Sequence, residues 1–146
     1  MTAANPDLVS DGVLSLTTTP IHFSAGGGAV PINGFAFDPA SFESYISGHT
    51  NASDPGRLGF IEHSAESWKL WERHPAGDEV VVVVSGVALF IQEIDGAQQH
   101  ARVGAGEAII NPAGVWHTAD VEEPFSALYL TPCPGTNHRP RETPPG

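Results

Sequence analysis

The protein has 146 residues, enough for one domain with a hydrophobic core. Hydrophobic residues make up 40% of the chain, which argues against wholesale disorder, and 16 glycines with 13 prolines favour short strands and turns over long helices. Seventeen acidic residues against six Lys and Arg give a formal net charge of −11, which argues against nucleic acid and anionic membranes as partners.

Residues 1–56 are expected to form an N-terminal segment that packs on the main domain. Residues 1–12 read as loose chain, and Gly26 to Gly28 as a flexible break. The stretch "INGFAF" at 32–37 is compatible with a short strand.

One short helix is expected in "DPASFESYISGH", residues 38–49. Asp38 can cap its first turn, Pro39 suits the first helical position, and Gly48 can end it. The apolar side chains that share one face at helical spacing are Phe42, Tyr45 and Ile46.

Residues 57–132 predict an all-β unit of about eight short antiparallel strands, a small barrel or sandwich. Turn residues such as Ser85-Gly86 and Asp95-Gly96 separate several of them. The expected strands are 58–63, 67–74, 79–84, 87–94, 97–103, 107–112, 115–121 and 125–131. Residues 133–146 are so rich in proline that we expect an irregular tail.

Five consecutive valines, Val80 to Val84, make one expected strand apolar on both faces. The N-terminal segment or a second subunit must then cover the outer face. Trp71 and Trp116 are also expected to point outward, and so large an apolar patch predicts a homodimer.

The single cysteine, Cys133, excludes a disulfide framework within the chain and a cysteine-based zinc finger, and we expect a spectator thiol. No signal peptide is visible at the start of the chain, and no apolar run approaches the roughly 20 residues that span a bilayer. We therefore expect a soluble cytoplasmic protein.

The stretch "WERHPAGDE", residues 71–79, concentrates ionisable side chains. Glu72 and His74 are two apart, so they project from the same face of a strand, and the turn after His74 can bring Glu79 beside them. Burying these groups without partners would cost several kcal/mol, and a divalent cation removes that cost by making them ligands. A further ligand must come from elsewhere in the chain.

Two stretches resemble the two motifs of the cupin superfamily. Residues 72–86 resemble the first, roughly His-x-His, three or four residues, Glu, six residues, Gly, and residues 106–117 resemble the second, Gly, five residues, Pro-x-Gly, two residues, His. The resemblance covers about half of the chain. It implies a jelly-roll β-barrel with the motif residues gathered around one metal, and it adds His117 as the distant ligand.

The sequence departs from the family pattern at Glu72, which stands where the first histidine is usual. Glu66 and Val121 replace a usual glycine and a usual asparagine, which matters less. Two imidazoles and two carboxylates would neutralise a divalent ion, and they favour manganese, iron, cobalt, nickel or zinc over copper(I). Glu72 can alternatively be a general base beside a three-ligand site.

Other polar and aromatic residues have a plainer interpretation. Arg139 and Arg141 could contact an anionic substrate, although a solvated tail explains them as well. Trp68 shares the Glu72 face and can line the pocket or the core. The histidines without motif spacing, expected at the surface or in loops, are His22, His49, His63, His100 and His138.

Three functional hypotheses remain open at this level. The first is a metal-dependent enzyme acting on a small oxygenated metabolite, with isomerase, lyase or dioxygenase chemistry. The second is a non-catalytic metal-binding or ligand-binding sensor domain with a closed coordination shell. The third is a metal-free barrel that carries an apolar small molecule.

Overall fold

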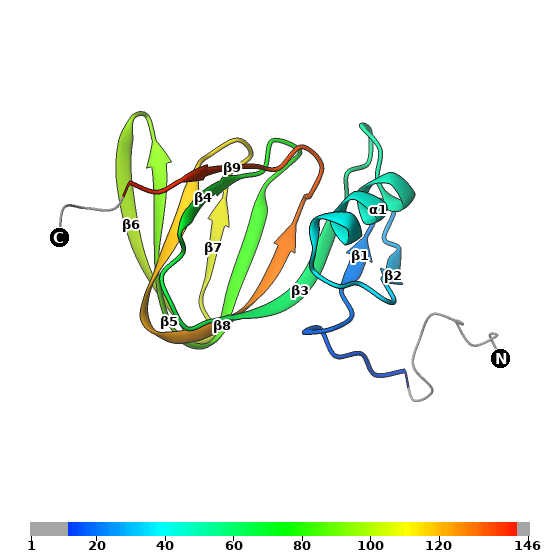
Figure 1. Cartoon of the computed structure of the whole chain (residues 1–146), viewed down its shortest axis with the longest axis horizontal. Coiled ribbons are helices and arrows are strands. Elements are labelled where there is room, and N and C mark those ends of the chain that lie inside the picture. Colours follow the sequence, from blue (N-terminus) through cyan, green and yellow to red (C-terminus); the bar gives the residue numbers. More distant parts are fainter. Residues whose placement is uncertain (1–11, 143–146) are drawn as a thin grey trace.

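The computed structural model describes residues 12–142, so the expectation of loose chain at residues 1–11 lies outside the described residues. This part of the chain forms nine strands and one helix (Figure 1). They are β1 (Ile21–Phe23), β2 (Ala29–Pro31), α1 (Pro39–His49), β3 (Arg57–Ser64), β4 (Leu70–Arg73), β5 (Glu79–Ile94), β6 (Ala97–Gly104), β7 (Ala108–Asn111), β8 (His117–Thr131) and β9 (Asn137–Pro140).

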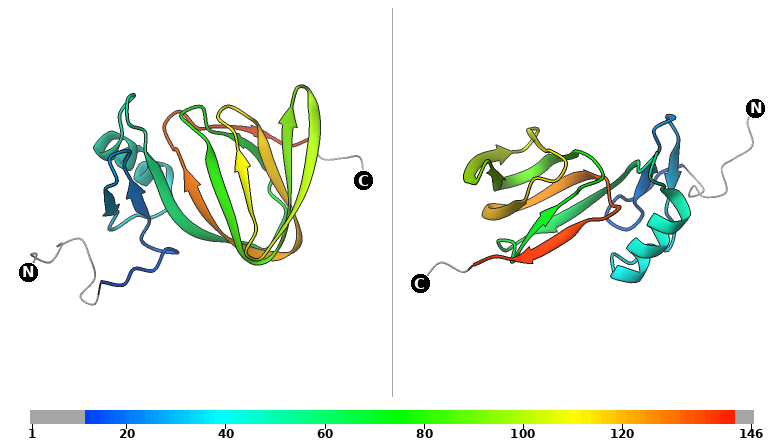
Figure 2. Two further views of the ribbon diagram at one scale, coloured as in Figure 1. Left: turned by 180° about the vertical axis from the view of Figure 1, so that it is seen from behind. Right: turned by 90° about the horizontal axis from the view of Figure 1, so that it is seen from above.

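The strands pair in antiparallel fashion, as expected for an all-β unit. The long strands β5 and β8 form the central pair, with Val81 opposite Tyr129 and Phe90 opposite Ala119. Strand β3 lines the other edge of β8, while β6 and β7 pair with β5. The sheet curls so strongly that β6 and β9 lie on opposite sides in the view from above (Figure 2).

The core lies between the curled halves of the sheet. Alternate residues of β3, β5 and β8 point inward, as the period of two in a strand requires. The larger buried apolar side chains of these strands are Leu58, Phe60, Val81, Val83, Phe90, Phe125 and Tyr129. The polar residues Glu79 and His117 are equally buried, at 1% and 0% exposure.

The prediction of a turn at Ser85-Gly86 is wrong, because β5 continues through these two residues as one strand from Glu79 to Ile94. The pairing with β8 shifts register at this point, which marks a β-bulge. Gly86 has a φ of +76°, and a Cβ there would overlap the carbonyl oxygen of Pro124. Only glycine therefore suits this position. The strands expected at 115–121 and 125–131 are likewise one strand, β8.

The N-terminal segment contains the expected helix. A side-chain oxygen of Asp38 accepts a hydrogen bond from the Ser41 amide at 2.8 Å, so Asp38 is the N-cap, and α1 ends at His49. The strand expected at 32–37 is absent, because Gly34 and Phe37 have positive φ values of 73° and 56° that break an extended segment. Figure 1 shows α1, β1 and β2 at one end of the molecule.

The C-terminal segment is not wholly irregular, contrary to expectation. Asn137–Pro140 form β9, which pairs with β4 so that His138 lies opposite Glu72. Proline is tolerated here because β9 is at the edge of the sheet, where a missing amide proton costs no ladder bond.

The apolar surface on β5 is only partly as expected. Val81 and Val83 are fully buried, whereas Val84 is 47% exposed, and Ile110 of β7, which lies opposite Val80, is 58% exposed. Trp71 does not point into solvent as predicted, since it is only 6% exposed and lies under the guanidinium of Arg139. Within residues 12–142 no helix has the length and apolar character needed to cross a membrane.

Candidate metal centre

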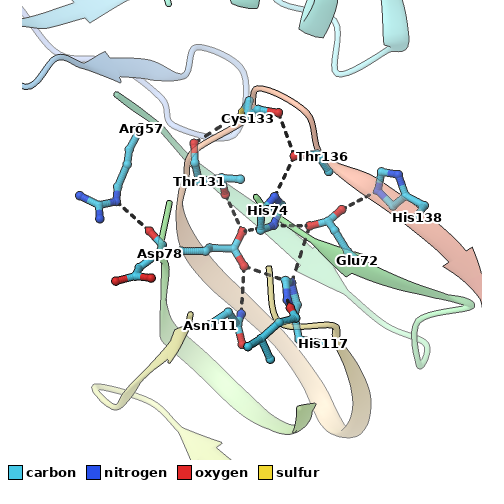
Figure 3. Close-up of polar contacts among 12 residues, drawn as sticks. Arg57, Glu72, His74, Asp78, Asn111, His117, Thr131, Cys133, Thr136 and His138 are labelled. Carbon is cyan, nitrogen blue, oxygen red and sulfur yellow. Dashed lines mark hydrogen bonds and ion pairs between the residues drawn. The ribbon is translucent and has the colours of Figure 1, made fainter. Parts of the chain in front are cut away.

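The four side chains expected at a metal site converge in the structure. Strand β4 carries Glu72, His74 follows its end, Glu79 begins β5, and His117 begins β8 opposite Glu72. Each of the four offers one nitrogen or oxygen atom, and these atoms all lie within 4.8 Å of one another (Figure 3).

The loops of the two sequence motifs hydrogen-bond to each other directly. The amide of Gly114 donates to the carbonyl oxygen of His74 at 3.0 Å. The amide of Ala113 donates to a carboxylate oxygen of Asp78 at 2.8 Å. These two bonds fix the turn between His74 and Glu79 against the loop that precedes His117, so the ligand candidates are held from both sides.

The imidazoles face the carboxylates through their Nε2 atoms. His74 Nε2 lies 2.9 Å from Glu72 Oε1 and 3.2 Å from Glu79 Oε2. His117 Nε2 lies 3.2 Å from Glu79 Oε1 and 3.8 Å from Glu72 Oε1. Ligand atoms about 2.1 Å from one ion lie roughly 3.0 Å apart at a right angle and roughly 3.4 Å apart at a tetrahedral angle. The observed separations are of this size.

The nitrogen atoms at the centre lack proper hydrogen-bond partners. His74 Nε2 and His117 Nε2 are both buried and form no hydrogen bond of good geometry, although carboxylate oxygens lie 2.9 to 3.8 Å away. Such buried orphan groups are rare and need an explanation. A divalent cation between two imidazoles and two carboxylates would provide it, so the residues present fit a metal ion.

Hydrogen bonds on the far side of each imidazole select the tautomer that a metal requires. The Thr136 hydroxyl donates to the carbonyl oxygen of Cys133 at 2.8 Å, so its oxygen accepts the proton of His74 Nδ1, also at 2.8 Å. His117 Nδ1 faces the carbonyl oxygen of Val115 at 3.4 Å, which can only accept. In the neutral form of each ring, Nε2 therefore presents a lone pair to the centre.

Glu79 is held rigidly by two neutral donors. The side-chain amide of Asn111 donates to Oε1 at 3.0 Å, and the Thr131 hydroxyl donates to Oε2 at 2.6 Å. Gln92 in turn donates to the side-chain oxygen of Asn111 at 2.8 Å and so fixes which way that amide points. Ligating carboxylates in proteins are commonly oriented by such outer hydrogen bonds.

Glu72 is the accessible member of the group. Its side chain is 27% exposed, against 3% for His74, 2% for Glu79 and 0% for His117. His138 of β9 donates from Nε2 to Glu72 Oε2 at 2.6 Å, on the side away from His74 (Figure 3). The centre is therefore nearest to solvent on the Glu72 side.

The carboxylates and imidazoles of the centre strongly shift one another's pKa values. Burial alone would lower the pKa of His74 and His117, but the Glu72 and Glu79 carboxylates outweigh it and raise both to about 9. Burial would raise the pKa of Glu79, but the two imidazoles lower it to about 2. The same imidazoles and His138 hold the pKa of Glu72 well below its usual range, despite burial.

A further carboxylate, Glu62, was not singled out from the sequence. It lies on β3, two residues beyond Phe60 and opposite Ala127 of β8, and it is exposed. Partial loss of hydration against the protein surface raises the pKa of Glu62, and the negative charges of Glu72 and Glu79 raise it further. Carboxylates with oppositely shifted pKa values are typical of sites where one stays ionised and another carries a proton.

Sequence reasoning missed His138 and the residues that orient the ligand candidates, which are Gln92, Asn111, Thr131 and Thr136. His138 is recognised from the pairing of β9 with β4, which places it opposite Glu72 and which no sequence pattern indicated. His63 instead contacts the Ser126 hydroxyl. Arg139 pairs with Glu93 and Arg141 with Asp120, so both arginines have partners within the chain.

The family model described as a cupin domain matches residues 60–131. The chain belongs to the cupin superfamily. The matched residues contain all four members of the cluster. The departure of this cupin from the family pattern is therefore a carboxylate, Glu72, in the place usual for a histidine.

Curated relatives of this cupin include acireductone dioxygenase from Rhodopseudomonas palustris strains TIE-1 and ATCC BAA-98 / CGA009. Each is 38% identical over 56 residues, which is 38% of this chain and 33% of the relative. The match thus spans about a third of the length of those proteins.

Similar solved structures include a cupin-2 domain containing protein from Shewanella frigidimarina NCIMB 400. It is 22% identical, with 58% of this chain and 71% of that chain covered and a TM-score of 0.43. Hydroquinone 1,2-dioxygenase from Sphingomonas sp. TTNP3 is 12% identical, with 51% and 58% covered and a TM-score of 0.44.

Proposed function

We propose that this cupin is a divalent-metal-dependent enzyme that acts on a small oxygenated metabolite. Dioxygenase-type chemistry is the favoured reaction, and isomerase and lyase chemistry are the alternatives. The observation that carries the proposal is the pair of buried Nε2 atoms, of His74 and His117, that face two carboxylates and have no hydrogen-bond partner of good geometry. The curled antiparallel sheet supports a jelly-roll barrel as the scaffold, with the site between its halves.

His74, Glu79 and His117 would hold the ion as a two-histidine, one-carboxylate set. A bound divalent ion would supply Lewis acidity toward a carbonyl or enol oxygen, and open positions for a second reactant if it is iron. The identity of 38% with acireductone dioxygenase over 56 residues supports the dioxygenase variant.

The remaining carboxylates would supply proton transfer. Glu72 is either the fourth ligand or the general base, since its Oε1 faces the imidazoles and its edge is open to solvent. If Glu72 is a ligand, Glu62 is the carboxylate left to carry a proton, because its raised pKa brings it closer to neutral pH.

The first experiment is elemental analysis of protein purified without a histidine tag. About one equivalent of manganese, iron, cobalt, nickel or zinc per chain supports the proposal. Protein that contains no metal and binds none of these ions in titration would favour the metal-free barrel.

Titrations of two Glu72 variants then assign its role. Glu72→Gln removes one charge and should weaken metal binding if Glu72 is a ligand, whereas Glu72→His restores the usual family residue and should hold metal at least as well. If Glu72 is the base, Glu72→Gln should keep the metal and lose about 10²–10⁴-fold in turnover. Equal affinity in all three proteins would remove Glu72 from the coordination shell.

A non-catalytic binding or sensor domain is the second candidate. Three of the four cluster side chains are at most 3% exposed, which is a feature of closed structural sites. A bound metal with no exchangeable water would favour this candidate, because a catalytic site keeps an open position.

A further inference from the structure

The two carboxylate oxygens of Glu72 face opposite ways. Oε1 lies 2.9 Å from His74 Nε2, inside the cluster, while Oε2 lies 2.6 Å from His138 Nε2. Figure 3 shows Glu72 between the two histidines. A carboxylate oxygen only accepts, so His138 Nε2 carries the proton of this short hydrogen bond in either of its charge states.

His138 is anchored by its neighbours in β9. The guanidinium of Arg139 lies 5.2 Å from the ring centre of Trp71 and 4.6 Å from that of Trp116, and it pairs with Glu93. Asn137 accepts a hydrogen bond from Arg73 Nε at 3.1 Å. These contacts fix the backbone of β9 on both sides of His138, so its ring meets Glu72 from a set position although the side chain is 48% exposed.

A carboxylate can bind a metal through one oxygen or through both. Two-oxygen binding by Glu72 would require Oε2 to leave His138 and would fill one more coordination position. That position would lie on the solvent-facing side, because Glu72 is the exposed member of the cluster. The hydrogen bond from His138 opposes this change.

We propose that His138 is a positioning residue that restricts Glu72 to one-oxygen coordination and so keeps a coordination position open on the solvent-facing side of the metal centre. The open position takes water or one oxygen of a small substrate. This inference rests on the proposed function to the extent that the cluster must bind a divalent ion with Glu72 as a ligand.

The test counts the exchangeable water on Mn²⁺ bound to the wild type, His138→Ala and His138→Gln, by water-proton relaxation enhancement. Four one-oxygen or one-nitrogen ligands leave about two water positions on a six-coordinate ion, and two-oxygen binding by Glu72 leaves about one. The inner-sphere relaxivity of His138→Ala should therefore fall about two-fold. His138→Gln keeps a side-chain N–H donor and should stay near the wild type.

The matched control is His100→Ala, which removes an exposed histidine from β6, a strand that pairs with β5 and not with β4 or β9 among the described residues. It should match the wild type, and near-identical circular dichroism should show that all variants fold. An unchanged or higher water count in His138→Ala, or an equal loss in His138→Gln, would overturn the inference while leaving the proposed function standing. A wild type that binds none of Mn²⁺, Fe²⁺, Co²⁺, Ni²⁺ and Zn²⁺ would overturn both.

Discussion

Metal binding to this cupin should expel two protons, one from each imidazole of the centre. Burial opposes protonation of His74 and His117, but Glu72 and Glu79 outweigh it and raise both pKa values to about 9 in the metal-free protein. Both rings are therefore protonated at neutral pH. The pKa of Glu79, lowered to about 2 by the imidazoles against the effect of burial, means that this carboxylate is already ionised. The ion must then displace protons from nitrogen and not from oxygen.

The expected magnitude follows from the number of protons. Each displaced proton makes the apparent affinity change about tenfold per pH unit, so two protons give about 100-fold. Between about pH 6 and about pH 8, the affinity should rise roughly 10⁴-fold, which is about 5 kcal/mol. Above about pH 9 the dependence should flatten, because the rings have lost their protons there.

The assay is calorimetric titration with Zn²⁺ against a competing chelator, in buffers of different ionisation enthalpy. The variation of the observed heat with the buffer counts the protons released. His117→Gln should release about one proton fewer, and the exposed His100→Ala should behave as the wild type. Release of fewer than about one proton near pH 7, or an affinity independent of pH, would refute this account of the centre.

Other predictions concern stability, orientation and assembly. In chelator-treated protein, the raised pKa values of His74 and His117 stabilise the fold below pH 6.5, and this contribution is lost as the pH rises toward 9. The lowered pKa of Glu79 stabilises the fold above pH 4.5, and this contribution is lost as the pH falls toward 2. Chemical denaturation should therefore show the greatest stability between pH 4.5 and pH 6.5. A metal-free protein whose free energy of unfolding rises between pH 6.5 and pH 9 would contradict this. Thr136→Val, which removes the acceptor for His74 Nδ1, should weaken metal binding about 10–100-fold in titrations without changing the circular dichroism. Light scattering should give twice the chain mass of 15.3 kDa at micromolar concentration, and Ile110→Asp should shift it toward the monomer. A wild type of 15.3 kDa would rule out the dimer.

The sequence by itself determined the features that depend on neighbouring residues. The alternation of a strand places Glu72 and His74 on one face, and the turn after His74 returns the chain with Glu79. The cap at Asp38 and the proline after it position the helix, because capping is a contact over three residues.

Some local signals were overridden by strand pairing. Ser85-Gly86 has the composition of a turn, yet β5 continues through it because β8 supplies partners on both sides of the bulge. The same pairing makes one strand of the two expected around Pro124, which lies exposed within β8.

Only the tertiary structure decided what surrounds the candidate ligands. His138 lies 66 residues after Glu72, and Thr136 lies 62 residues after His74, so no spacing rule connects them. They meet because β9 pairs with β4, and the arginine on β9 that stacks on Trp71 and Trp116 holds this pairing in place. The sequence therefore determined which side chains are candidates to bind an ion. The fold decided, through contacts between distant strands, which nitrogen each imidazole presents and which side of the centre remains open.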